Sequence, residues 1–200
     1  DPAPAAANRT TMSIEVINGD LANPAHAHAL VQLLSEYALD PMGGGKALPA
    51  EVQQELALRL AERTDYHFVL ARDASGFVGL VNCFEGFSTF KGKPLINIHD
   101  VIVSMRARGR GVARLMLQQV EAIARERGCC KLTLEVLEGN HPAQNSYRAV
   151  GFKGYELDPV MGRAMFWENR RRYRRYFRAN YYNFTSTKRR KLSRFKMFIS

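Results

Sequence analysis

One segment, residues 95–137, constrains the fold of this chain more than any other. An apolar run typical of a β-strand at residues 95–103 leads into a turn that contains glycine. The turn opens a helix predicted over residues 109–127, whose apolar stripe consists of Val112, Leu115, Met116, Val120, Ile123 and Ala124. Gly128 stands where a glycine commonly ends a helix, and a second strand is predicted at residues 131–137. This order predicts two parallel strands joined by a crossover helix.

The segments around this unit predict a mixed α/β fold. Further strands are expected at residues 13–17, 66–71, 77–84, 152–157 and 164–167. Further helices are expected after Asn23-Pro24, after Pro49 and at residues 142–150. Residues 73–76 have turn composition and join two strands as a hairpin, whereas residues 85–94 are expected to form a loop. The predicted sheet is therefore mixed and mostly antiparallel, with the β-α-β unit at its centre.

The charge of the chain is unevenly distributed. Lys and Arg number 29 against 19 Asp and Glu, a formal net charge of +10, but residues 170–200 hold 12 of the basic residues and no acidic one. We therefore expect a leader or disordered segment at 1–12, a near-neutral domain at 13–168 and a basic, aromatic extension at 169–200. Only the extension has the composition to bind single-stranded nucleic acid, and a solvated segment without function is the alternative.

The remaining composition predicts the compartment and the absence of a metal. No run of about 18 apolar residues occurs, so no membrane helix and no membrane partner are expected. The three cysteines (Cys83, Cys129 and Cys130) are odd in number and include a vicinal pair, which does not suit a disulfide framework and favours a reducing cytoplasm. Cys129 and Cys130 fall where a strand is expected to begin, so we expect them to be buried thiols. The histidines lack the spacing of metal ligands, so we expect no metal site.

The turn before the central helix predicts an anion site. Backbone N–H groups at a helix start, together with the helix dipole, attract phosphate, and glycine lets the backbone approach it closely. Arg108, Arg110 and Arg114 add positive charge. Arg114 stands where a dinucleotide-binding motif needs its third glycine, and no Walker loop is present. On these residues alone, an ordinary helix start with solvated arginines remains an alternative.

Two segments together resemble a known family. Arg108-Gly109-Arg110-Gly111-Val112-Ala113 resembles the acetyl-CoA signature of the GNAT N-acetyltransferases, Q/R-x-x-G-x-G/A. Residues 140–152 resemble the later motif of that family, N-x-x-A-x-x-x-Y-x-x-x-G-F/A, through Asn140, Ala143, Tyr147, Gly151 and Phe152. One helix and one strand separate the two motifs, as in the family. The resemblance covers about residues 13–168 and implies the GNAT fold.

The resemblance also implies how acetyl-CoA is bound as cosubstrate. The backbone of Val101, Ile102 and Val103 would face the pantetheine arm and the thioester, and the Val103 amide would donate to the acetyl carbonyl. The pyrophosphate would lie on the main-chain N–H groups of Arg108, Gly109, Arg110, Gly111, Val112 and Ala113, with Arg114 beside them. Asn140, Ala143 and Tyr147 would contact the cofactor near the opened strands. The resemblance gives residues 169–200 no role.

Tyr147 and His99 are the predicted catalytic residues. Tyr147 matches the tyrosine that protonates the leaving thiolate, and a ring that only packs in the core is the alternative. His99 would accept the proton of the amine, because an ordinary histidine titrates near neutral pH. A structural histidine, with water carrying the proton away, is the alternative. Since neighbouring strand residues point to opposite faces, we expect only one of His99 and Asp100 to reach the site.

The acceptor would lie against the variable parts of the chain. The predicted substrate residues are Tyr37, Phe84, Glu85, Phe87 and Asp100, with Glu36 and Asp40 as further acids. Ile98-His99-Asp100-Val101 is loosely similar to diamine and polyamine acetyltransferases. We therefore expect transfer of acetyl from acetyl-CoA to a primary amine, favouring a small molecule, by direct attack. The alternatives are a non-catalytic acetyl-CoA sensor and a nucleic-acid-binding module that uses the extension, and a homodimer is left open.

Overall fold

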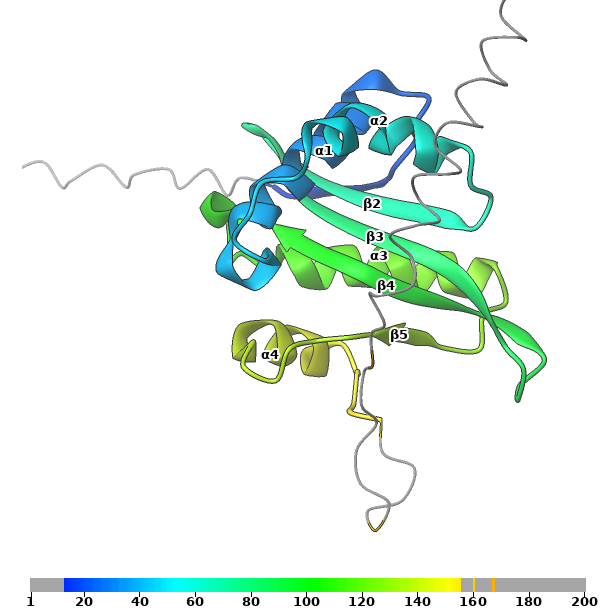
Figure 1. Ribbon diagram of the computed structural model, residues 1–200. Helices are drawn as coiled ribbons and strands as arrows, with labels where there is room; N and C mark the ends of the chain where they lie inside the picture. Colours follow the sequence, from blue (N-terminus) through cyan, green and yellow to red (C-terminus); the bar gives the residue numbers. More distant parts are fainter. Residues whose placement is uncertain (1–12, 156–159, 161–166, 168–200) are drawn as a thin grey trace, which may run out of the picture. The chain divides into compact units, whose positions relative to one another are not determined.

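Five strands form one sheet in the order of the sequence (Figure 1). The computed structural model describes residues 13–155, 160 and 167, and the chain divides into two units, 1–153 and 154–200. The strands of the first unit are β1 (Glu15–Asn18), β2 (Tyr66–Asp73), β3 (Gly76–Ser88), β4 (Lys93–Val103) and β5 (Leu132–Leu134). Neighbours from β1 to β4 pair antiparallel, while β4 and β5 pair parallel. The predicted fold class is confirmed.

The helices begin and end at residues suited to those positions. They are α1 (Pro24–Leu39), α2 (Ala50–Ala61), α3 (Val112–Glu126) and α4 (His141–Ala149), with short 3-10 turns η1 (Pro41–Gly43) and η2 (Met105–Ala107). Asn23 caps α1 by accepting the Ala25 amide at 2.9 Å, and Pro24 occupies the first helical position. Gly128 follows α3 with φ of +68°, the left-handed conformation that glycine adopts without strain.

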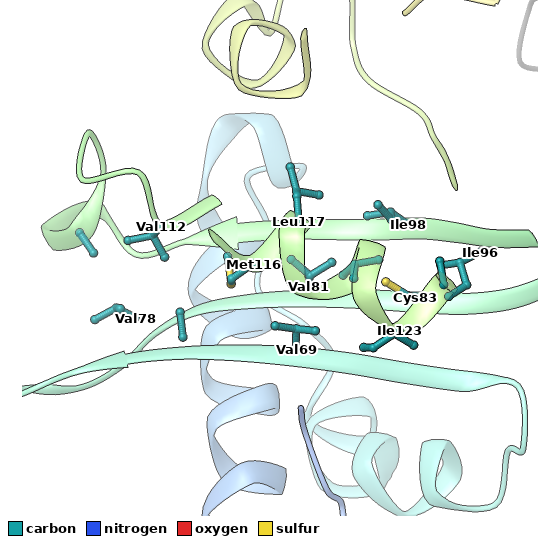
Figure 2. Packing of buried hydrophobic residues seen from close by; sticks show 14 residues of the cluster. Val69, Val78, Val81, Cys83, Ile96, Ile98, Val112, Met116, Leu117 and Ile123 are labelled. Atoms are coloured by element: carbon teal, nitrogen blue, oxygen red, sulfur yellow. The ribbon is translucent and has the colours of Figure 1, made fainter. Parts of the chain in front are cut away.

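Two hydrophobic clusters fix the helices on opposite faces of the sheet. On one face, Met116, Leu117 and Ile123 of α3 lie over strand residues such as Val81 and Ile98 (Figure 2). Gly79 of β3 allows this close approach, because a Cβ there would lie 2.8 Å from the Met116 sulfur. On the other face the cluster contains Leu30 and Leu33 of α1, Leu60 of α2, and Phe68, Leu70, Leu80 and Ile102 of the sheet. Each fully buried side chain of this size contributes about 1.5–3 kcal/mol.

Three sequence predictions about the strands need correction. Residues 85–94 are not a loop, since β3 runs to Ser88, β4 starts at Lys93, and Phe87 pairs with Pro94. The last strand spans three residues instead of the seven expected at 131–137. Residues 152–155 form no strand, and the rest of that prediction lies outside the described residues, as does the strand expected at 164–167 except for Trp167. The segments 1–12 and 169–200 also lie outside the described residues.

Candidate active site

The sheet opens between β4 and β5 at the centre of the predicted cofactor site. Their pairing ends at Ile98 opposite Leu134, whereas β4 continues to Val103. The Ser104 amide donates to the Val78 carbonyl of β3 at 2.9 Å. The backbone N–H and C=O groups of successive strand residues point to opposite sides in turn. Those of Val103 and Val101 therefore point away from β3, toward the open edge. A hydrogen bond supports this direction, since Arg108 Nε donates to the Val103 carbonyl at 3.2 Å. The open edge therefore presents backbone donors and acceptors.

A bulge in β4 brings His99 and Asp100 to one face of the sheet. Asn82 of β3 pairs with Asp100 and the next residue, Cys83, pairs with Ile98, so His99 is the extra residue. The His99 ring meets Phe84 edge-on at 4.9 Å, and Asn82 Nδ2 donates to Asp100 Oδ2 at 3.0 Å. Asn82 and Phe84 are two residues apart on β3 and share a face. The expectation that His99 and Asp100 point to opposite faces of the sheet is therefore wrong.

Tyr147 extends from α4 toward the same opening. Its half-buried ring packs against the α3-side cluster and meets Phe152 edge-on at 6.1 Å. Burial, followed by the charges of the nearby Tyr37 and Asp100, raises the pKa of Tyr147 to about 12. The phenol therefore stays protonated at neutral pH and can donate a hydrogen bond. Asn140 caps α4 by accepting the Ala143 amide at 3.3 Å, so these two residues fix the helix that carries Tyr147.

Tyr37 and Asp40 border the opening from the end of α1. The Tyr37 hydroxyl donates to the Met42 carbonyl at 3.2 Å. Burial, followed by the charges of Asp100 and Asp40, raises the pKa of Tyr37. Asp40 accepts from Arg108 at 2.8 Å, and this hydrogen bond lowers the pKa of the Asp40 carboxyl. Arg108 thus connects the end of α1 with the open edge of β4.

The turn before α3 exposes backbone N–H groups to an anion. Gly109 and Gly111 have φ of +74° and +76°, and no atom lies within 4 Å of a Cβ built at either position. No side chain caps α3, so its first amides are left for a ligand. This open, glycine-lined cradle with uncapped amides fits the pyrophosphate of acetyl-CoA.

The arginines of this turn differ in how far their side chains are engaged. Arg110 donates to the Asp73 carboxylate at 2.7 Å, and Arg108 is held by Asp40 and the Val103 carbonyl. Arg114 is exposed, and within the described part of the chain no ion pair is found for it. The guanidinium groups of Arg108 and Arg110 are therefore engaged by carboxylates, whereas that of Arg114 is exposed.

Two of the predicted substrate residues lie away from this opening. Glu85 pairs with Arg127 beyond the end of α3 and lies 3.8 Å from His67 Nε2. Phe87 is 63% exposed on the part of β3 that pairs with the start of β4, whereas the opening lies at the end of β4. The structure does not bring these two residues to the site. Tyr37 and Asp100 lie near Tyr147, and Phe84 reaches this region only through its contact with His99.

Comparisons with known proteins identify this arrangement. The sequence model of the acetyltransferase (GNAT) family matches residues 27–152. The chain belongs to the GNAT acetyltransferase family. An aminoglycoside N-acetyltransferase solved in complex with CoA is 16% identical to this GNAT chain and covers 82% of it and 99% of its own length, with a TM-score of 0.64. This structural likeness concerns the fold.

Two curated relatives match a shorter part of the GNAT chain. A streptothricin acetyltransferase of Streptomyces lavendulae is 38% identical over 66 residues, which cover 33% of this chain and 35% of the relative. A thialysine N-epsilon-acetyltransferase of Bos taurus is 34% identical over 74 residues, which cover 37% of this chain and 43% of the relative. The chain thus matches less than half the length of these relatives.

Sequence reasoning missed two residues that hold the candidate site residue Asp100 through hydrogen bonds, Asn82 and Tyr66. Asn82 accepts the Tyr66 hydroxyl at 2.7 Å while it donates to Asp100. The detectable signal is a single amide within the apolar run at residues 77–84, because a polar side chain buried in a strand needs partners. Tyr66 gives no such signal, since a tyrosine at the start of a strand is common.

Within the described residues, two further properties of the GNAT unit bear on its chemistry. No helix there is long and apolar enough to cross a membrane, and no group of three potential metal ligands occurs. Cys83, Cys129 and Cys130 are free thiols. Cys83 is buried, and burial raises its pKa to about 12. Cys129 and Cys130 were expected to be buried, but they are only half-buried.

Proposed function

We propose that this chain transfers an acetyl group from acetyl-CoA to the primary amine of a small molecule. The observation that carries the proposal is the opening between β4 and β5, where backbone groups of Val101 and Val103 line a free edge and the Tyr147 phenol faces the same region. Membership of the GNAT family supports the reaction type. Acetyl-CoA, when bound, supplies a thioester that an amine can attack.

The cradle and the open edge would divide the binding of acetyl-CoA between them. The N–H groups of residues 109–114 would hold the pyrophosphate, with Arg114 adding charge. The Val101 and Val103 backbone would orient the pantetheine arm along β4. Arg108 occupies the Val103 carbonyl at 3.2 Å, so pantetheine and Arg108 would share this acceptor or compete for it.

The acceptor would approach from the face that carries His99. Its neutral amine forms the new C–N bond with the carbonyl carbon, and the C–S bond breaks. The Val103 amide stabilises negative charge on the carbonyl oxygen, and His99 takes the proton that the amine loses. The leaving sulfur receives a hydrogen bond or the proton of Tyr147. With its pKa raised to about 12, this phenol holds its proton until the sulfur carries charge.

Two further points support a small acceptor in a reducing compartment. The relatives are named for streptothricin and thialysine, which are small amines. The three free thiols agree with a cytoplasmic location. We therefore favour a small amine over a protein substrate, and a cytoplasmic setting.

The proposal is tested by incubating the full chain with acetyl-CoA and a panel of amines. The panel contains monoamines, diamines, lysine and an aminoglycoside, and thiol release is recorded while mass spectrometry detects the acetylated product. We expect amine-dependent thiol release with at least one amine, above hydrolysis without amine. Binding of CoA without transfer to any amine would instead identify the acetyl-CoA sensor.

A further inference from the structure

We propose that Asp100 binds a second, positively charged amine of the acceptor, and that Asn82 is the residue that positions Asp100 for this role. The preferred acceptor is then a diamine or a related dication. This inference rests on the proposed acetyl transfer and deepens it, because it names the substrate class of the same site.

Asp100 differs in its partners from seven other carboxylates of the described residues. Each of the seven pairs with an arginine, and they are Glu15, Asp40, Glu55, Asp65, Asp73, Glu85 and Glu121. Within the described residues, no cationic side chain forms an ion pair with Asp100, whose one hydrogen bond comes from the neutral amide of Asn82 to Oδ2. A half-buried carboxylate in this position favours a cation supplied from outside.

Asn82 fixes the direction of the Asp100 carboxylate. Its side chain is buried, with 5% of the residue exposed, so water does not compete for the amide. The Tyr66 hydroxyl donates to Asn82 Oδ1 at 2.7 Å, which leaves Nδ2 to face Asp100. Tyr66 is itself held between Phe68 and Phe84, whose ring centroids lie 5.5 and 5.2 Å away. The three side chains thus form one ordered row ending at the carboxylate.

The position of Asp100 on β4 suits the second, charged amine of the acceptor and not the amine that attacks the thioester. An attacking amine must be neutral, whereas a carboxylate nearby favours the protonated form of an amine. Asp100 precedes Val103, the residue beside the thioester, by three positions, which corresponds to roughly 10 Å along a strand. His99 is exposed on the same face next to Phe84, and a carbon chain that joins the two amines would run along this face.

Cadaverine and pentylamine test the inference, since they share a five-carbon chain and differ in the second amine. We expect the wild type to prefer cadaverine in kcat/KM, and Asp100→Asn to lower this preference by about tenfold or more. Asn82→Leu should also lower the preference for cadaverine, through a higher KM for cadaverine, because the Asp100 carboxylate loses its orientation. Asp65→Asn, which removes an acid paired with Arg63, is the control with the same change in charge.

The outcomes separate this inference from the proposed function. Transfer to no amine of the panel would overturn the proposed function itself. Transfer without a preference for cadaverine, or a preference that Asp100→Asn retains, would overturn the role of Asp100 alone. A preference that survives Asn82→Leu would remove Asn82 from its positioning role, and CoA affinity measured on each variant shows whether it has folded.

Discussion

Tyr147 is the residue whose environment says most about the reaction. Burial, with the nearby Tyr37 and Asp100, raises its pKa to about 12, so the phenol keeps its proton where an ordinary tyrosine ionises near pH 10. We predict that Tyr147→Phe lowers kcat by roughly 100- to 10,000-fold, the usual contribution of a general acid, with CoA affinity retained. Thiol release and CoA titration measure the two quantities.

The pH dependence of kcat gives a second readout for Tyr147. Because the raised pKa keeps the phenol protonated, kcat of the wild type should not fall between about pH 8 and pH 10 on account of this residue. Tyr155→Phe removes a phenol that is 68% exposed and serves as the matched control. A Tyr147→Phe variant with kcat within threefold of the wild type would leave the ring a packing role only.

At the scale of elements, the turn before α3 depends on glycine for its shape. Gly111 has φ of +76° and open space around a built Cβ, so an alanine would strain the backbone without a clash. We predict that Gly111→Ala destabilises the protein by about 1–3 kcal/mol and weakens CoA binding by about tenfold or more, because the amides lose their common direction. Urea unfolding and CoA titration measure these effects.

Alanine substitutions at two other glycines distinguish the effect of backbone strain on stability from the effect on CoA binding. Gly92 at the β3–β4 turn also has positive φ, +59°, and open space, so Gly92→Ala should show the same loss of stability with unchanged CoA affinity. Gly139 has open space without positive φ, so Gly139→Ala should be close to neutral in both measurements. Equal CoA affinities in Gly111→Ala and Gly92→Ala would contradict a pyrophosphate site at the turn.

Elements with strong local signals could be predicted from the sequence, and those defined by pairing could not. The cap at Asn23 and the glycine after α3 are local, and both helices were predicted within a few residues. Residues 85–94 carry glycine and proline, which favour a loop, but pairing with the neighbouring strand extends β3 and β4 through most of them. The β4 bulge depends on its partner strand and gives no signal in the sequence.

In the candidate site, too, local motifs could be predicted from the sequence and contacts between distant residues could not. Contiguous motifs predict the turn at residues 108–113 and Tyr147 on α4. The partners of Arg108 and Arg110 could not be predicted, because Asp40 and Asp73 are distant in sequence and meet them only in the folded chain. The row from Tyr66 to Asp100 likewise joins three strands through side chains 16 and 18 residues apart.

For the whole molecule, ion pairs predict how stability depends on pH. Arg72 and Arg63 lower the carboxyl pKa values of Glu15 and Asp65, and Ser75 followed by Arg110 lowers that of Asp73. Groups with a lowered pKa stabilise the fold above their unfolded pKa, and this contribution is lost as pH falls through the folded pKa. We predict a falling free energy of unfolding below about pH 4, measured by urea unfolding.

His67 adds an earlier and smaller step to the same curve. Burial lowers its pKa, so the unfolded chain takes up this proton first, and stability begins to fall below about pH 6.5. Asp73→Asn removes one of the carboxyls and should make the acid part of the curve shallower. A free energy of unfolding that is equal at pH 7 and pH 3 would contradict the contribution of these pairs.

The charge of the whole chain is concentrated at one end. Residues 170–200 carry 12 Lys and Arg and no acid, and their removal changes the formal net charge from +10 to −2. All proposed site residues precede residue 148, so we predict that deleting 170–200 leaves acetyl transfer intact. Any binding of single-stranded RNA that weakens steeply with salt should disappear, since it would depend on phosphate contacts from this segment.

Thiol release and RNA titration at several salt concentrations, each on the full and the shortened chain, decide between the outcomes. Loss of acetyl transfer on deletion would show that the catalytic domain does not end near residue 168. A full chain with no salt-dependent RNA binding would leave the extension without a nucleic-acid role. The second result bears on the extension alone, because the glycine turn before α3 and the opened strands are built from residues of the near-neutral part of the chain.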